Sequence, residues 1–218
     1  MTTKDLSLEH VLRPSSLTKE KAPAIIMLHG YGSNENDLFS FAPELDKKYL
    51  VISVKAPIPM QPFGNAWYAI TYDPGNNKFT DDEQAMVSRD TIAQFIDEVV
   101  ESYNADPNQI TLLGFSQGAI LSYAVALSYP EKVNRVVGMS GYIHQTLLKE
   151  NYEKGDFSNL KVYSSHGSVD EVVPVEWDRK TKPFLENLGI ETKYSEFPIG
   201  HGVSPENFRE VQQWLAKG

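Results

Sequence analysis

The sequence predicts an α/β domain in which helices cover both faces of a mostly parallel central sheet. Continuous apolar runs, which are typical of strands buried on both faces, alternate along the chain with amphipathic patterns that are typical of helices. The chain of 218 residues shows no internal repeat, heptad pattern or change of composition. We therefore expect residues 1–218 to form a single domain that is large enough to bury a substantial core.

The strands are predicted from two kinds of pattern. Residues 6–12 alternate well enough to form an edge strand, whereas continuous apolar runs indicate strands inside the sheet. In open parallel sheets, ligands bind at the carboxyl ends of the strands, so the loops that follow these runs are the places to search for a site. The remaining strands are expected at residues 24–29, 50–54, 110–113, 133–137, 161–165 and 191–197.

The helices are predicted where apolar residues recur at steps of three and four. Thr80 or Asp81 is available to cap the first helix, Pro130 halts the second, and Gly189 stops the third. Pro205 occupies the first position of the last helix, where proline is favoured. The expected helices cover residues 81–103, 117–129, about 174–188, and the chain from about 204 onward.

The composition argues against several classes of function. A formal net charge of −9 and scattered lysine and arginine residues give little support for nucleic-acid binding. The absence of cysteine excludes disulfides, thiolate zinc sites and cysteine nucleophiles. The first residues lack a signal-peptide pattern and no apolar run is long enough to cross a bilayer, so we expect no integral membrane segment and a cytoplasmic protein.

A long irregular segment at residues 55–80 is rich in proline, glycine and aromatic residues. Loops of this length in a compact domain usually have a function or are disordered, and the aromatic content argues against disorder. Its large apolar side chains either line an apolar acyl or alcohol pocket or pin the loop to the core, and the sequence leaves both possibilities open. These side chains are Met60, Phe63, Trp67, Tyr68 and Ile70.

The segment GFSQG at residues 114–118 matches the nucleophile-elbow pattern of glycine, any residue, serine, any residue and glycine. It has the required context, because an apolar strand precedes it and a helix follows it. In such a turn the hydroxyl of Ser116 projects above the sheet. The alternative is an ordinary tight turn, in which Gly114 and Gly118 are present only because they lack a Cβ atom.

A serine hydroxyl needs a base to become a nucleophile, and the base needs a carboxylate to orient it. His201 is the best candidate base, because it directly follows the predicted strand at 191–197 and is flanked by glycines. Asp170 lies in the loop after another strand and is the candidate acid, with Glu171 as the alternative. We expect His166 to shape that loop, and His144 to be a surface residue.

The oxyanion of an acyl-transfer reaction needs hydrogen-bond donors, and the backbone amide of Gln117 should be one of them. The second donor should come from the loop at residues 28–39, which follows an early strand, and there the amide of Tyr31 is the candidate. His29 precedes a glycine turn, which suits a role in fixing the loop. We expect no metal site, because no histidine pair has ligand spacing on a helix.

Four motifs, LHGYGSNENDLF, GFSQGA, HGSVDEVVP and GHGVSPE, together resemble the phospholipase/carboxylesterase family of α/β hydrolases, to which acyl-protein thioesterases and small bacterial carboxylesterases belong. They occur in family order between residues 28 and 207. The resemblance implies an α/β-hydrolase fold, a homodimer and a site made of Ser116, Asp170, His201 and the amides of Tyr31 and Gln117.

The expected function is hydrolysis of small-molecule carboxylic esters through an acyl-enzyme, with no cofactor. A thioesterase or lysophospholipase with the same triad is the enzymatic alternative, and a ligand-binding relative with a vestigial site is the non-enzymatic one. The segment NENDLF resembles the bacterial esterase branch. The segment AWYAI has alanine at a position where the family often carries an acidic residue. This departure concerns contacts with the substrate, and Asp73 is a candidate to supply the missing acid.

Overall fold

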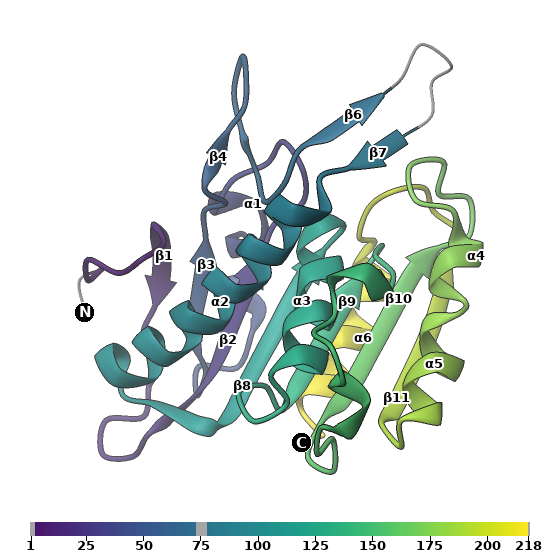
Figure 1. Ribbon diagram of the computed structural model, residues 1–218. Helices are drawn as coiled ribbons and strands as arrows, with labels where there is room; N and C mark the ends of the chain where they lie inside the picture. Colours follow the sequence, from purple (N-terminus) through teal and green to yellow (C-terminus); the bar gives the residue numbers. More distant parts are fainter. Residues whose placement is uncertain (1–2, 73–77, 218) are drawn as a thin grey trace.

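The computed structural model describes residues 3–72 and 78–217, and its centre is a seven-stranded sheet of order β1-β3-β2-β8-β9-β10-β11 (Figure 1). All neighbouring strands in this sheet are parallel except β1, which is antiparallel to β3. The predicted, mostly parallel sheet is therefore present. Its strands are β1 (His10–Arg13), β2 (Ala22–Leu28), β3 (Leu50–Val54), β8 (Ala105–Phe115), β9 (Arg135–Met139), β10 (Lys161–Gly167) and β11 (Glu191–Phe197).

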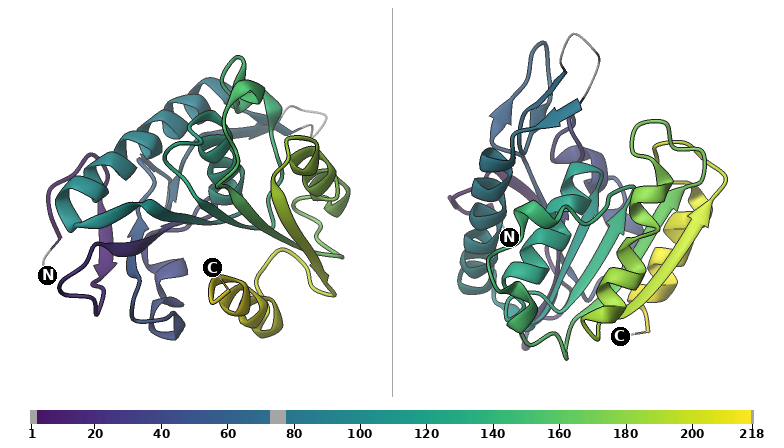
Figure 2. Two further views of the ribbon diagram at one scale, coloured as in Figure 1. Left: turned by 90° about the horizontal axis from the view of Figure 1, so that it is seen from below. Right: turned by 45° about the vertical axis from the view of Figure 1, so that its right-hand side comes forward.

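Helices cover both faces of the sheet, as Figure 2 shows in the view from below. One face carries α2 (Asp82–Tyr103), α3 (Gln117–Ser128), α4 (Val175–Asp178) and α5 (Thr181–Asn187). The opposite face carries α1 (Asn36–Phe39) and α6 (Pro205–Leu215). The described residues also form three short 3-10 helices, η1 (Ala42–Glu44), η2 (Gln145–Leu147) and η3 (Tyr152–Lys154). None of the helices in the described residues combines the length and the apolar character that crossing a bilayer requires.

The alternation of side chains along β2 explains why this strand is apolar throughout. Ile26 and Leu28 belong to the core beneath α2 and α3, whereas Ile25 and Met27 belong to the core beneath α1 and α6. Successive residues of a strand point to opposite faces, so a strand between two helical layers must be apolar at every position. A fully apolar run therefore identifies a strand in the middle of a three-layer fold.

The helix ends agree closely with the predicted signals. Asp81 caps α2 by accepting a hydrogen bond from the N–H of Gln84 at 2.9 Å. Ser204 caps α6 in the same way through the N–H of Asn207 at 3.1 Å, and Pro205 is the first residue of that helix. These caps satisfy donors that have no partner inside the helix.

Several predicted elements have different bounds, and β8 begins at Ala105, before the expected strand at 110–113. The helix expected at about 174–188 is divided into α4 and α5, because Pro183 has no N–H to continue the helical hydrogen bonds from the preceding turn. The first strand begins at His10 and not at residue 6, since His10 already pairs with Val54, the last residue of β3. Residues 3–9 therefore lie beyond the end of β3.

The segment predicted as irregular contains two small hairpins that extend beyond the carboxyl ends of the parallel strands (Figure 1). In one hairpin β4 (Ile58–Pro59) pairs with β5 (Asn65–Ala66), and in the other β6 (Ile70–Tyr72) pairs with β7 (Lys78–Thr80). The strands contain only two or three residues each, which is too short for alternation to appear in the sequence. Asp73, the predicted replacement acid, lies outside the described residues.

Candidate active site

Ser116 lies at the junction of β8 and α3, in a backbone conformation that is uncommon for a residue with a side chain. Its φ is 53° and its ψ is −117°, and its N–H donates to the carbonyl of Met139 at 2.9 Å. Positive φ at a residue other than glycine costs free energy, and such residues cluster at functional sites. The predicted strand, turn and helix are therefore all present around this serine.

The glycines on either side of Ser116 allow close packing of the backbone. A Cβ atom on Gly118 would lie 1.9 Å from the carbonyl oxygen of Leu28, and one on Gly114 would lie 2.3 Å from the carbonyl oxygen of Gly118. Both distances are far shorter than a van der Waals contact. The glycines are thus required for packing α3 against β2 and β8, and the same turn presents Ser116.

Three side chains from separate loops meet at the carboxyl ends of the parallel strands. The Nε2 atom of His201 is 3.0 Å from the hydroxyl oxygen of Ser116, and its Nδ1 atom is 2.7 Å from Oδ2 of Asp170. The two later loops are joined by hydrogen bonds from the N–H groups of Ser168 and Val169 to the carbonyls of residues 197 and 199, at 2.7 and 3.2 Å. These bonds bring Asp170 beside His201.

The carboxylate of Asp170 is fully enclosed and surrounded by donors. Its Oδ1 accepts hydrogen bonds from the N–H groups of Val172 at 2.8 Å and Val173 at 2.9 Å. Its side chain is 0% exposed, whereas Glu171 is exposed. The bonds from Val172 and Val173 fix the orientation of the carboxylate, whose Oδ2 faces His201. Asp170, and not Glu171, therefore contacts His201 in the structure.

The hydrogen bonds of His201 select one tautomer of its ring. Because an ionised Asp170 can only accept, Nδ1 of His201 must donate, and in a neutral ring Nε2 is then left to accept the hydroxyl hydrogen of Ser116. The ring packs beside Phe115 with their centroids 4.9 Å apart. This arrangement fits removal of the serine proton by the imidazole.

The two segments that carry the predicted oxyanion donors lie next to the serine. Gln117 is the first residue of α3, and the loop carrying Tyr31 runs next to Ser116, since a Cβ atom on Gly30 would be 3.4 Å from Cβ of Ser116. Within the described residues, the amides of Gln117 and Tyr31 donate no hydrogen bond to another group of the protein. Both amides are therefore free to bind a substrate oxygen.

His29 holds this loop through both of its ring nitrogens. Nδ1 donates to the carbonyl of Gly30 at 2.8 Å, and Nε2 accepts from the N–H of Ala56 at 3.0 Å. Burial lowers the pKa of His29, and this effect exceeds the opposing hydrogen bond to Gly30. A neutral imidazole thus joins the ends of β2 and β3, which agrees with the loop-fixing role inferred for it.

The side chain of Gln117 has a structural role that the sequence did not reveal. Its Oε1 accepts from the N–H of Trp67 at 3.1 Å, and its Nε2 donates to the carbonyl of Tyr68 at 2.8 Å. Trp67 also donates from Nε1 to the carbonyl of His29 at 2.9 Å, and its own carbonyl accepts from Ser88. The residue expected to supply an oxyanion amide therefore also anchors the long loop, a pairing with no local sequence signal.

The five side chains predicted to line a pocket differ greatly in exposure. Trp67 and Tyr68 are 0% and 1% exposed, whereas Phe63 is 79% exposed. Met60 and Ile70 are partly exposed. Enclosure of Trp67 and Tyr68 favours the packing alternative for these two, and contact with substrate remains a prediction for the set.

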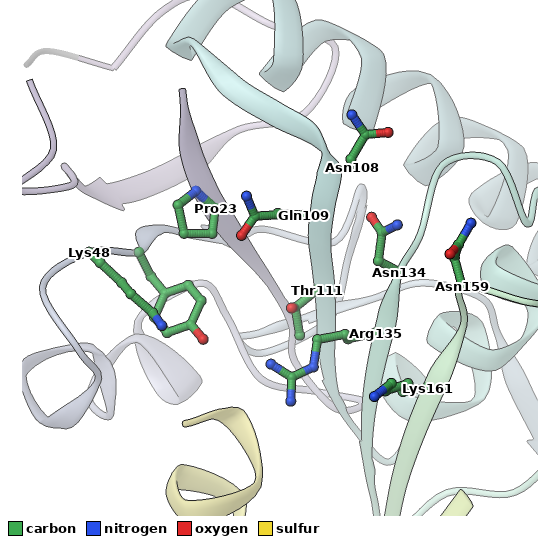
Figure 3. Close-up of a pocket in the computed structure, with 10 residues that line it drawn as sticks. Pro23, Lys48, Asn108, Gln109, Thr111, Asn134, Arg135, Asn159 and Lys161 are labelled. Atoms are coloured by element: carbon green, nitrogen blue, oxygen red, sulfur yellow. The ribbon is translucent and has the colours of Figure 1, made fainter. Parts of the chain in front are cut away.

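A cavity of about 260 Å³ lies at the amino-terminal ends of the parallel strands (Figure 3). Ser116 follows the carboxyl end of β8, at the opposite edge of the sheet. The cationic side chains of the cavity include Arg135 and Lys161, and both have partners. Arg135 donates to the carbonyls of Leu215 at 3.0 Å and Trp214 at 2.7 Å, and Lys161 pairs with Glu191 at 3.3 Å. Among the described residues, no group of three or more metal-binding side chains comes together.

A model of the phospholipase/carboxylesterase family matches residues 13–218 of this chain. The chain belongs to the phospholipase/carboxylesterase family. The resemblance inferred from the four motifs is thereby confirmed, and the chain is placed in a serine hydrolase family of carboxylesterase and acyl-protein thioesterase type.

Relatives within this family match over most of their length. Acyl-protein thioesterase 1 of Emericella nidulans is 27% identical, with 90% of both chains covered. Acyl-protein thioesterase 1 of Saccharomyces cerevisiae is 25% identical, with 94% of this chain and 97% of that protein covered. Both relatives therefore match this chain over nearly its whole length.

Solved structures show the same α/β-hydrolase fold. Esterase PE8 superposes with a TM-score of 0.84 at 24% identity, over 97% of this chain and 99% of that one. The carboxylesterase of Bacillus cereus superposes with a TM-score of 0.83 at 20% identity, over 97% and 94% of the two chains. The predicted fold class is therefore confirmed.

Proposed function

We propose that this member of the family hydrolyses carboxylic esters through an acyl-enzyme formed on Ser116. The observation that carries the proposal is the continuous hydrogen-bonded series from Ser116 through His201 to Asp170. These residues come from three loops that are far apart in the sequence. A vestigial binding protein would have no need to keep all three groups in register, so the geometry favours an enzyme.

Each group has a defined part in the proposed reaction. His201 takes the hydroxyl proton as Oγ of Ser116 attacks the carbonyl carbon, and Asp170 stabilises the resulting imidazolium. The amides of Tyr31 and Gln117 bind the oxyanion of the tetrahedral intermediate. His201 then donates its proton to the leaving alcohol, and a water molecule repeats the attack on the acyl-enzyme to release the acid and restore Ser116.

A thioester is the second candidate substrate, because two relatives that match over at least 90% of this chain are named acyl-protein thioesterase 1. The same attack opens a thioester, with a thiol leaving in place of an alcohol. Purified protein assayed on aryl esters, acyl thioesters and lysophospholipids of graded chain length will rank these substrates by kcat/KM. Preference for the thioester at matched chain length would replace the ester in our proposal.

Replacement of the nucleophile gives the direct test. We expect Ser116→Ala to lower hydrolysis of a short-chain aryl ester by several orders of magnitude, because the acyl-enzyme is no longer formed. A fluorophosphonate probe should label the unaltered protein covalently and leave Ser116→Ala unlabelled. The exposed residue Ser158 provides the matched control. Ser158→Ala should keep both ester hydrolysis and labelling by the fluorophosphonate probe. Near-normal turnover by Ser116→Ala would overturn the assignment.

A further inference from the structure

A second histidine lies directly behind the carboxylate of Asp170. His166 is near the end of β10 and its side chain is 0% exposed. Its Nε2 atom is 2.8 Å from the carbonyl oxygen of Val173 and 3.3 Å from Oδ2 of Asp170, and its Nδ1 atom is 3.2 Å from Oδ2 of Asp178. Since carbonyl and carboxylate oxygens only accept, both ring nitrogens face acceptors and are arranged to donate.

Burial raises the pKa of Asp178, and the hydrogen bonds from His166 and Ser164 together with the charge of His166 oppose this effect. The side chain of Asp178 is 0% exposed, and Ser164 lies within 2.9 and 3.0 Å of its two oxygens. The hydroxyl of Tyr123 donates to the oxygen of Ser164 at 2.8 Å, so the hydrogen of Ser164 is directed at Asp178. Hydrogen bonds received from a hydroxyl and an imidazole N–H stabilise the ionised form of the carboxyl group.

We propose that His166 is a positively charged positioning residue that bridges two buried carboxyl groups and holds Asp170 oriented toward His201. The proposal rests on the function proposed above for the triad. Two enclosed carboxylates repel each other, and a buried charge is costly unless it is paired and hydrogen-bonded. One imidazolium between Asp170 and Asp178 offsets both costs, and its bond to Val173 also holds the loop that carries Asp170.

The electrostatics agree with this geometry. Burial lowers the pKa of His166, but the hydrogen bonds to Asp178 and Val173 and the negative charges of Asp178 and Asp170 outweigh burial. The pKa of His166 is therefore raised above its usual value of 6.5.

The other titratable groups around the pair contribute little charge. Glu196 lies opposite His166 in the register of β10 and β11, and the guanidinium of Arg179 binds it at 2.7 Å. Burial raises the pKa of Tyr123 on α3 and of Tyr194 on β11, so both phenols are neutral near pH 7. The charges that face the ring are thus mainly those of Asp170 and Asp178.

Nuclear magnetic resonance tests the protonation state without requiring activity. In Ser116→Ala protein labelled with ¹⁵N-histidine, we expect both ring nitrogens of His166 to carry hydrogens at pH 7. The spectrum of a His166→Gln variant identifies the signal. A neutral ring with one unprotonated nitrogen would overturn the proposal whether or not the protein hydrolyses esters, so failure of this inference is distinct from failure of the proposed function.

Kinetics test the consequence for the triad. In His166→Gln the side-chain amide keeps a hydrogen-bond donor for Val173 but carries no charge. A positive charge close to a protonation site opposes protonation there, so removing it should make protonation of the triad easier. We expect the acid limb of kcat/KM to move to higher pH by about one unit, with kcat falling more than KM rises. Asp178→Asn removes the carboxylate that stabilises the charge on His166, so we expect His166 to become neutral in this variant. The acid limb should then shift in the same direction by a smaller amount, because the lost positive charge of His166 is nearer to Asp170 than the lost negative charge of Asp178.

The control is a histidine in a similar pair elsewhere. His144 was expected at the surface and is partly buried, and it faces Asp82 at 3.2 Å. His144→Gln should leave the pH profile unchanged. If His166→Gln and Asp178→Asn lower only the melting temperature or the total activity and keep the pH profile, the role of His166 is structural and our proposal is wrong. Asp178→Asn preserves side-chain shape, so the comparison remains possible if His166→Gln fails to fold.

Discussion

Gly118 lets the first turn of α3 approach the end of β2 more closely than any side chain permits. A methyl group at this position would lie 1.9 Å from the carbonyl oxygen of Leu28, which is a backbone atom and cannot rotate away. We expect Gly118→Ala to lower the free energy of unfolding by about 1–3 kcal/mol, as overpacking does. It should also lower kcat, because Gln117 and Ser116 are carried by the same turn.

Urea unfolding and ester hydrolysis measure these two effects. Gly155→Ala is a suitable comparison, since its methyl group would lie 3.0 Å from a ring carbon of Pro130 and 3.1 Å from the carbonyl oxygen of Tyr152, both much longer than the contact at Gly118. We expect a smaller loss of stability from Gly155→Ala than from Gly118→Ala. Equal stability of Gly118→Ala and the unaltered protein would contradict the packing role given to this glycine.

The residues of the candidate site differ in how visible they are in the sequence. Ser116, Asp170 and His201 follow predicted strands, and the chemistry of a serine nucleophile asks for these residue types, so their proximity was expected. Asp178 gave no such signal, because its neighbours Glu176 and Arg179 make the segment look like an exposed helix. The enclosure of Asp178 comes from contacts with Ser164 and His166 on β10, which are far from it in the sequence.

Among the elements, the long segment at 55–80 depends on Trp67 for its position. The backbone N–H, the carbonyl and the indole N–H of Trp67 are bonded to Gln117, Ser88 and His29 respectively. We expect Trp67→Ala to lower the free energy of unfolding by about 3 kcal/mol or more. It should also lower kcat, because the loop that carries the amide of Tyr31 loses a support. A raised KM with an unchanged melting temperature would instead indicate substrate contact.

Phe63 provides the opposite case in the same segment, since it is 79% exposed. Phe63→Ala should leave the melting temperature unchanged, because little apolar area leaves a packed environment. If Phe63 contacts substrate, the KM of Phe63→Ala for apolar esters should exceed that of the unaltered protein, and the difference should grow as the acyl chain lengthens. An unchanged KM across the ester series would remove Phe63 from the predicted pocket.

Elements with strong local signals were predicted closely, and those fixed by neighbours were not. The caps at Asp81 and Ser204 act through their own side chains, so the starts of α2 and α6 could be read from the sequence. The length of β1 is set by the end of β3, and β4 to β7 are too short to show a period. Pairing partners decide these bounds, and a single sequence does not name them.

For the whole molecule, parallel strands explain why distant residues meet. Ser116 follows β8, Asp170 follows β10 and the His201 loop follows β11, and the loops after parallel strands share one edge of the sheet. The edge was predictable from the alternation of strands and helices. The strand order was not, since the sequence alone does not fix which parallel strands are neighbours.

Two buried histidines should limit the stability of the whole molecule on opposite sides of neutral pH. Burial lowers the pKa of His29 in the folded protein below its value of about 6.5 in the unfolded chain. Between these two pKa values the unfolded chain binds more protons than the folded protein, so stability falls as the pH decreases. The pKa of His166 is raised by the bonds and charges that outweigh its burial. Between about 6.5 and this raised value the folded protein binds more protons, so stability falls as the pH increases.

The measurement is the free energy of urea unfolding between about pH 5 and pH 9, compared with single variants so that the contributions of other groups cancel. His29→Gln should flatten the decrease on the acid side, and His166→Gln should flatten the decrease on the alkaline side. His144→Gln should leave both sides as they are. If His166→Gln and the unaltered protein keep parallel curves above pH 6.5, His166 gains no proton affinity on folding, which would contradict the charged imidazole bridge in the folded protein.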